Sequence, residues 1–139
     1  MSNTAQKERG FEFRLDLASG VPTYRQIIDQ VLGGIASGVL VPGAQLPTVR
    51  QVAVDLAINP NTVSRAYREL EIRGVLETQQ GTGTFVSRQK VKRDDIERRR
   101  QLNQIVSEFL SRAGAAGFTV ADLMEQLRDV ASNDNQKRR

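Results

Sequence analysis

The sequence predicts an α+β fold that is mainly helical: a winged helix-turn-helix domain followed by a short two-helix region. Three observations lead to this prediction. Apolar residues recur at helical spacing in three consecutive segments between residues 23 and 73, and a short break separates the second from the third. A glycine-rich hairpin signal over residues 75–87 follows directly. Two further helical stripes lie beyond residue 95.

Composition narrows the function classes. The chain has 139 residues, of which 39% are hydrophobic and 26% charged, enough for one domain and an appendage. Histidine and cysteine are absent, which excludes disulfides, imidazole catalysis and thiolate metal sites. We find no paired carboxylates, phosphate loop or nucleophile turn, so we expect no enzyme, metal or cofactor. The sequence has no signal region and no apolar run of membrane-spanning length, which predicts a cytoplasmic protein without a membrane partner.

The amino-terminal part is predicted to contain a strand and a helix. Residues 1–10 are polar and aperiodic and are expected to be a disordered tail. Residues 11–17 alternate apolar and charged, the pattern of a β-strand with one buried face. A helix should then begin at Thr23, which has the spacing of a capping box with Gln26, and should end at Gly38. A loop leads from there to Leu46.

The helix-turn-helix comes next. Thr48 and Gln51 form a second capping box and open a short helix. Asn59 suits the N-cap of a third helix and Pro60 its first position, and this helix should run to about Arg73. Residues 75–78 and 84–87 are strand-like and flank the glycine-rich residues 79–83, which together predict the wing of a domain spanning 11–88.

The remaining residues are predicted to form a helical dimerisation region over 89–132 and a disordered tail over 133–139. Residues 88–100 form a charge-dense connector. Beyond it, two apolar stripes are too narrow to make a core alone, so we expect them to pair with a second copy of the chain. The residues of these stripes are Leu102, Ile105, Val106, Phe109, Leu110, Leu123, Met124 and Leu127.

The third helix carries the polar face of most interest. With Val63 set at zero on the helical wheel, Ala66, Tyr67 and Leu70 lie within about 60° and should be buried, and Asn61, Arg65 and Arg68 lie opposite. Such a face can read bases and phosphates in a major groove, although any exposed helix has a polar face. The charge surplus over residues 21–88 is small, six arginines against five acidic residues, so DNA contact would depend on individually placed arginines.

Two further features could contact a phosphate. Arg50 stands in the first turn of its helix, where a cation opposes the helix dipole; an anionic ligand or a plain surface position would both account for it. Gly81 and Gly83 would let the backbone at the hairpin tip approach a sugar-phosphate edge closely, or they serve only the geometry of the turn. Thr82 adds a hydroxyl donor at the same place.

These residues carry a family resemblance. The pattern Leu46-Pro47-x-x-Arg50, Thr62-Val63, Gly74 and Gln80-Gly81-Thr82-Gly83-Thr84-Phe85-Val86 resembles the GntR family of bacterial regulators over roughly residues 21–87. The resemblance implies DNA contacts from the arginine of the first motif, the start of the recognition helix and the wing glycine. Pro60 and Ser64 stand where the family often has arginine, which makes Arg65 the candidate substitute. The predicted DNA-binding residues are Thr48, Arg50, Asn61, Thr62, Ser64, Arg65, Arg68, Gln80, Gly81, Thr82 and Gly83.

The carboxy-terminal region indicates a subfamily. Only 51 residues (139 − 88) follow Arg88, too few for a large effector domain. Two short helices, together with the leading strand over 11–17 and Asn59-Pro60-Asn61-Thr62, resemble the YtrA-like subfamily. This resemblance implies a homodimer on an inverted-repeat operator in double-stranded DNA, acting as a repressor or an activator, with repression favoured and a transporter operon as a candidate target. A small-molecule effector could bind the tail, and the sequence identifies none.

One alternative function class is a winged helix that docks a protein instead of DNA. Arg50, Arg65 and Arg68 favour DNA, whereas Ile72, on the outward side of the third helix, favours a protein partner. Nothing in the sequence supports a binder of double-stranded RNA.

Overall fold

The structure is a computed structural model that describes residues 11–88 and 94–137. The chain divides into two units, residues 1–88 and 89–139, which are considered separately. The tail expected at 1–10 lies outside the described residues, as do residues 138–139 of the tail expected over 133–139 and residues 89–93 of the connector.

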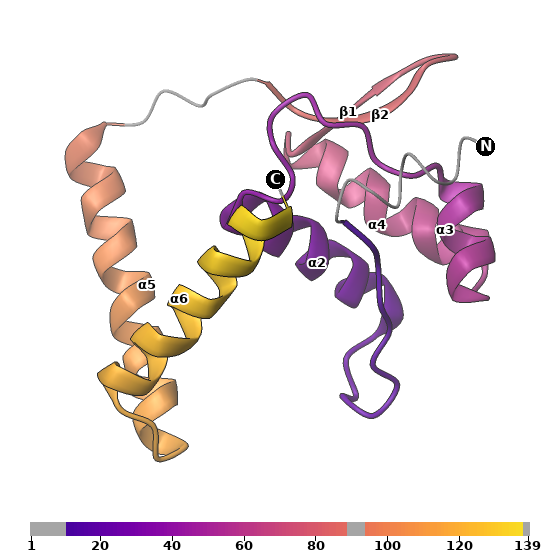
Figure 1. The fold of residues 1–139 in the computed structure, drawn as a ribbon. Coiled ribbons are helices and arrows are strands. Elements are labelled where there is room, and N and C mark those ends of the chain that lie inside the picture. Colours follow the sequence, from indigo (N-terminus) through magenta and orange to yellow (C-terminus); the bar gives the residue numbers. More distant parts are fainter. Residues whose placement is uncertain (1–10, 89–93, 138–139) are drawn as a thin grey trace. The chain divides into compact units, whose positions relative to one another are not determined.

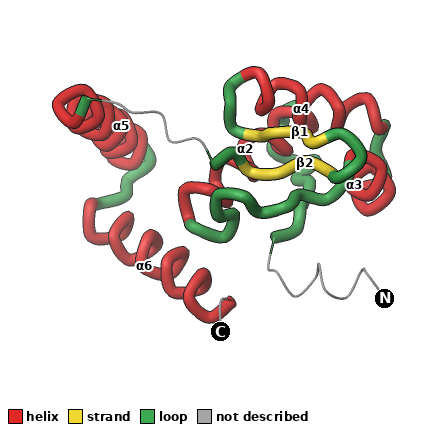
Figure 2. The backbone as a smooth tube through the Cα atoms, turned by 90° about the horizontal axis from the view of Figure 1, so that it is seen from above, coloured by secondary structure: helices red, strands yellow, loops and turns green. Residues whose placement is uncertain are grey.

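The described residues of the first unit form three helices and a hairpin (Figure 1): α2 (Thr23–Ser37), α3 (Val49–Leu56), α4 (Pro60–Ile72), β1 (Leu76–Gln79) and β2 (Gly83–Val86). The helix α4 packs against α2, α3 and β1. The strands β1 and β2 lie side by side (Figure 2). They are antiparallel, with Leu76 opposite Val86 and Gln79 opposite Gly83. A two-stranded wing after a helix-turn-helix is the fold predicted from the sequence.

The core of this unit lies around α4. The four residues placed inward by the helical wheel, Val63, Ala66, Tyr67 and Leu70, are all buried. They pack in one cluster with α2, whose Ile27 is fully buried, and with the strands. The wheel succeeds here because each turn of α4 presents an apolar residue to the same side.

The helix-turn-helix is capped as expected at both helix starts. The side chain of Thr48 accepts a hydrogen bond from the Gln51 amide at 3.0 Å, and that of Asn59 accepts one from the Asn61 amide at 2.8 Å. Between the helices, Ala57 adopts a left-handed conformation with φ of +54°. These contacts satisfy amides that helix starts leave unpaired.

The capping box predicted at Thr23 is wrong. Thr23 is the first residue of α2, and Pro22 precedes it without a side-chain cap. The side chain of Gln26 instead binds residue 16: its Oε1 accepts from the Asp16 amide at 2.8 Å, and its Nε2 donates to the Asp16 carbonyl at 2.9 Å. The glutamine therefore holds the segment that precedes the helix rather than the helix start.

The strand predicted over 11–17 is also wrong. Residues 11–16 pair with no strand of the described sheet. Gln30 binds the amide and carbonyl of Arg14 at 2.8 and 2.6 Å, as Gln26 does for Asp16, so two side chains one helical turn apart replace a partner strand. The predicted alternation of burial is present from Phe11 to Asp16 and fails at Leu17, which is exposed.

The hairpin has a further backbone partner in the segment predicted as a loop before α3. The Leu46 amide donates to the Thr84 carbonyl, and the Val86 amide to the Ala44 carbonyl, both at 2.8 Å. Because β2 lies between β1 and this segment, the wing is attached to the start of α3 through its backbone.

The second unit contains α5 (Asp95–Ala115) and α6 (Val120–Lys137). The α5 helix starts inside the predicted connector, where the Asp94 side chain caps the Ile96 amide at 3.1 Å. The α6 helix continues to Lys137, so the disordered tail predicted from residue 133 begins too early. Residues 131–137 contain no glycine or proline, and each residue added to an existing helix adds a hydrogen bond. Among the described helices, none has the length and apolar character to cross a membrane.

Candidate nucleic-acid interface

The outward side of α4 carries the predicted recognition residues. Asn61, Ser64, Arg65 and Arg68 are exposed, and Thr62 is partly buried. Since the apolar residues of the same helix are locked in the core, α4 cannot rotate to hide this side. The polar face expected from the sequence is therefore present on a rigidly held helix.

The Arg65 side chain does not stand freely away from the helix. Its guanidinium carbon lies 3.8 Å from the centre of the Tyr24 ring on α2, a cation–π contact. Tyr24 is partly buried and packs against the core cluster. No local sequence pattern predicts this contact, because Tyr24 lies on the first helix of the domain and Arg65 on the third.

The start of α3 is tied to α4 by a partly buried hydrogen bond. The Tyr67 hydroxyl donates to the Pro47 carbonyl oxygen at 2.6 Å, and burial raises the pKa of Tyr67 well above its ordinary value. Thr48 follows as the N-cap, and Arg50 stands exposed in the first turn. The two residues predicted to contact DNA from α3 are thus fixed relative to the recognition helix.

The wing tip is a tight turn held by a side chain that the sequence did not single out. Gln80, Gly81 and Thr82 are exposed, and the Thr82 amide donates to the Gln79 carbonyl at 3.0 Å. The Gln45 side-chain amide donates to the Thr82 carbonyl at 3.2 Å. A Cβ atom on Gly83, whose φ is +141°, would lie 2.6 Å from the same amide nitrogen. Gly83 is therefore required where Gln45 supports the tip.

The first strand of the wing is joined to the end of α4. The Thr78 hydroxyl donates to the Glu71 carboxylate and lies 3.3 Å from the Thr84 hydroxyl across the hairpin. With Tyr67 and Gln45, this contact connects α3, α4 and the wing, the three elements that carry all eleven predicted DNA-binding residues.

The second unit exposes the apolar stripes predicted for dimerisation. Seven of the eight predicted residues are exposed, and Leu123 is partly buried. Phe118, Val120 and Val130 add to the exposed apolar surface. Of the described side chains in this unit, only that of Ala113 is buried. An apolar surface of this extent is typical of a protein-interaction site.

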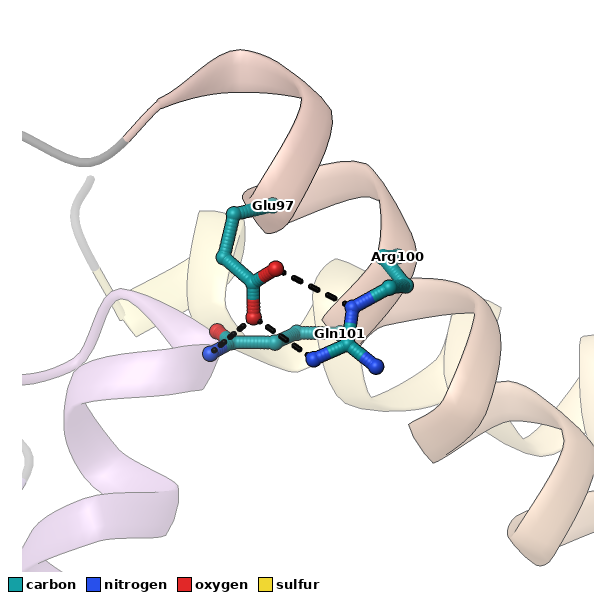
Figure 3. A network of polar contacts seen from close by, with 3 residues as sticks. All are labelled: Glu97, Arg100 and Gln101. Atoms are coloured by element: carbon teal, nitrogen blue, oxygen red, sulfur yellow. Dashed lines mark hydrogen bonds and ion pairs between the residues drawn. The ribbon is translucent and has the colours of Figure 1, made fainter.

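The start of α5 carries consecutive arginines with different surroundings. Arg98 and Arg99 are exposed. Arg100 donates two hydrogen bonds to the Glu97 carboxylate, at 3.0 and 2.9 Å, and Gln101 donates to the same group at 3.4 Å (Figure 3). The Glu97 hydrogen bond raises the pKa of Arg100. The charge of Arg100 is therefore balanced within its own helix.

Comparisons with known proteins agree with this architecture. The family of bacterial regulatory proteins called gntR matches residues 23–86. The HTH-type transcriptional regulator Rv1152 of Mycobacterium tuberculosis is 39% identical over 117 residues, covering 84% of this chain and 92% of that protein. The HTH-type transcriptional repressor YtrA of Bacillus subtilis is 34% identical over 121 residues, covering 86% of this chain and 92% of that protein.

A solved structure gives the same assignment. YtrA from Sulfolobus acidocaldarius, a GntR-family transcription factor, is 34% identical with a TM-score of 0.53, covering 71% of this chain and 97% of that one. The similarity to Rv1152 and Bacillus YtrA covers most of both proteins, so it includes more than the winged domain. The chain therefore belongs to the GntR family and is a YtrA-like helix-turn-helix transcriptional regulator, not an enzyme.

Proposed function

We propose that this regulator binds an inverted-repeat operator in double-stranded DNA as a homodimer and represses transcription from it. The observation that carries the proposal is the division of α4 into a fully buried apolar side and an exposed side with Asn61, Arg65 and Arg68. Amide and guanidinium groups form hydrogen bonds with base edges and phosphates when a helix occupies the major groove.

The contacts divide among three elements. The start of α4, with Asn61, Thr62 and Ser64, enters the groove and reads bases. Arg50 on α3 binds a backbone phosphate, and Gly81 brings the wing backbone close to the sugar-phosphate edge. Support for this division comes from the hydrogen bonds of Tyr67 and Gln45, which hold α3 and the wing against α4 and its neighbours.

Dimerisation follows from the exposed stripes of α5 and α6. A second copy would cover residues such as Ile105 and Leu127, which are 63% and 56% exposed in the single chain. A two-fold dimer presents two recognition helices related by symmetry, which is what inverted half-sites require.

Repression is favoured because the Bacillus relative YtrA is named a repressor. A dimer bound across a promoter would exclude RNA polymerase. We expect the regulator to act in the cytoplasm on a nearby operon, with a transporter operon as the first candidate. A small-molecule effector that binds the helical tail would release the regulator from its operator.

The protein-docking alternative rests on Ile72, which is 79% exposed near the end of α4. The rest of that side of the helix is polar, and single exposed apolar residues are normal on protein surfaces. DNA is therefore the better-supported partner for this face.

Selection from a pool of random duplexes tests the DNA proposal and identifies the operator in the same experiment. The full chain should enrich an inverted repeat and bind it at least 1,000-fold more tightly than unselected duplex at about 0.15 M salt. Arg68→Ala should weaken binding, whereas Arg128→Ala, an exposed arginine of α6, should not. Enrichment of nothing, or of sites without two-fold symmetry, would contradict the proposal.

Sedimentation tests the dimer. The wild-type chain should sediment as a dimer at tens of micromolar, and the double variant Ile105→Lys/Leu127→Lys as a folded monomer with weakened operator binding. A wild-type monomer at that concentration would disprove this part. Thermal unfolding of the winged domain should be unchanged in the variant, which separates lost pairing from lost folding.

A further inference from the structure

The Arg65 side chain is held by a residue of another helix. Its guanidinium carbon lies 3.8 Å from the ring centre of Tyr24, close enough for contact between the cation and the ring face. The ring itself is well anchored, because Ile27 and Ile28, one turn further along α2, are fully buried against α4. The Arg65 side chain, which has many rotamers, is thus restrained by the Tyr24 ring, which has few.

The charge of Arg65 remains available to a ligand. Within the described residues Arg65 makes no ion pair. Arg25, the basic neighbour of Tyr24, is paired with Asp29 at 3.6 Å on its own helix. The aromatic ring orients the Arg65 cation but does not neutralise it, so a DNA phosphate could still bind it.

The contact also determines the direction of the guanidinium. On the helical wheel Arg65 lies opposite the buried side, from which a straight side chain would point at the floor of a groove. Contact with Tyr24 instead directs the group toward the flank of α4 next to α2. The flank of a helix lying in the major groove faces the groove wall, where the phosphates are.

We propose that Tyr24 is a positioning residue that holds Arg65 at the flank of α4 to bind a backbone phosphate, leaving base reading to Asn61, Thr62 and Ser64. This inference rests on the proposed function, since it assumes that α4 enters the major groove. It changes the role of Arg65 from the base reader expected from the sequence to a phosphate contact that depends on a second helix.

The first test compares Arg65→Ala with the wild type on the selected operator and on random duplex across a salt series. The loss of a phosphate contact should weaken binding to the operator and to random duplex by the same factor. It should also reduce the slope of log K against log salt by about 1. A loss on the operator that clearly exceeds the loss on random duplex would show that Arg65 reads a base, and would overturn the proposal.

The second test changes the ring. Tyr24→Leu should weaken binding to both duplexes about two- to fivefold, which is the scale of an exposed cation–π contact. Tyr24→Phe keeps the ring and should bind both duplexes as the wild type does. The Tyr24→Leu loss should disappear in an Arg65→Ala background. Equal binding by Tyr24→Leu and the wild type, or additive losses in the double variant, would show that the ring does not act through Arg65.

Two controls keep the outcomes separate. Thermal unfolding establishes that each variant is folded, and the Arg65 side-chain resonance in the wild type should show a ring-current shift that Tyr24→Phe retains. An absent shift would overturn the contact without any DNA measurement. Failure of the wild type to bind any duplex would contradict the proposed function. If the wild type binds the operator and Tyr24→Leu binds it equally well, only this inference is contradicted.

Discussion

The Tyr67 hydroxyl donates a 2.6 Å hydrogen bond to the Pro47 carbonyl oxygen and so joins the middle of α4 to the residue preceding the Thr48 cap. The ring of Tyr67 is 2% exposed, and burial raises its pKa, so the hydroxyl stays protonated and remains a donor at all physiological pH values. One side chain thus fills the core and fixes the start of α3 relative to the recognition helix.

Tyr67→Phe should destabilise the winged domain by about 1 kcal/mol, because the partly buried Pro47 carbonyl loses the hydroxyl that donates to it. Urea unfolding measures the change. Tyr24→Phe is the matched control, since the Tyr24 hydroxyl makes no hydrogen bond within the described residues, and its free energy of unfolding should stay within a few tenths of a kcal/mol. Equal losses in the two variants would mean that the Tyr67 hydroxyl bond contributes nothing measurable.

Arg50→Ala should weaken binding to the operator and to random duplex by the same factor and lower the salt slope by about 1, as expected when a phosphate contact is lost. Fluorescence anisotropy over a salt series measures both quantities. Arg128→Ala on α6 removes the same charge from an exposed site outside the winged domain and should change neither. A loss confined to the operator would assign Arg50 to base reading instead.

The predictions from sequence succeeded where a repeating pattern dictates a structure by itself. The spacing of apolar residues predicted the buried and exposed sides of α4, and the N-cap residues Thr48 and Asn59 predicted where α3 and α4 begin. Both predictions succeed because they depend only on residues a few positions apart. Glycines and flanking strand-like residues gave the wing for the same reason. The fold class and the exposed polar side of α4 were therefore accessible from the sequence.

The failures in the amino-terminal segment involve partners that lie far apart in the chain. The alternation over 11–17 predicted burial correctly as far as Asp16, but the pairing groups are side chains of Gln26 and Gln30, which no strand pattern encodes. The links from Gln45 to Thr82 and from Arg65 to Tyr24 likewise depend on how the helices pack. Packing of this kind is a property of the folded chain and is not visible in local spacing.

Two adjacent glycines of α2 provide a test of the amino-terminal segment. Nothing lies within 4 Å of a Cβ atom placed on Gly33, whereas one on Gly34 would lie 3.0 Å from both Phe11 and Leu40. Gly33→Ala should stabilise the domain by roughly 0.5–1 kcal/mol through helix propensity, and Gly34→Ala should lose that gain to crowding. Thermal unfolding measures both.

Hydrogen exchange of the Arg14 amide, which is bonded to Gln30, separates the two variants further. Exchange should accelerate in Gly34→Ala, where Phe11 must move, and stay unchanged in Gly33→Ala. If both variants gain the same stability and leave the amide protected, the packing of Phe11 on α2 is looser than the structure indicates.

The cap of α6 predicts a pH dependence with a defined sign. The Asp122 carboxylate accepts hydrogen bonds from the Thr119 amide at 2.8 Å and from the Thr119 hydroxyl at 3.0 Å, and these two bonds lower the pKa of Asp122, the backbone bond most. A group with a lowered pKa in the folded state stabilises that state above its ordinary pKa. The stabilisation is lost as the pH falls through the folded-state value, so acid should loosen the first turn of α6.

Titration of the Asp122 carboxyl carbon by NMR measures this directly, with a midpoint expected below that of an unstructured aspartate. Thr119→Ala removes the hydroxyl donor and keeps the backbone one. The midpoint of the variant should therefore rise only part of the way towards the ordinary aspartate value, because the backbone hydrogen bond, which is the larger cause of the lowered pKa, remains. A midpoint at the ordinary aspartate value in the wild type would refute the cap, and an unchanged midpoint in Thr119→Ala would show that the hydroxyl does not bind the carboxylate in solution.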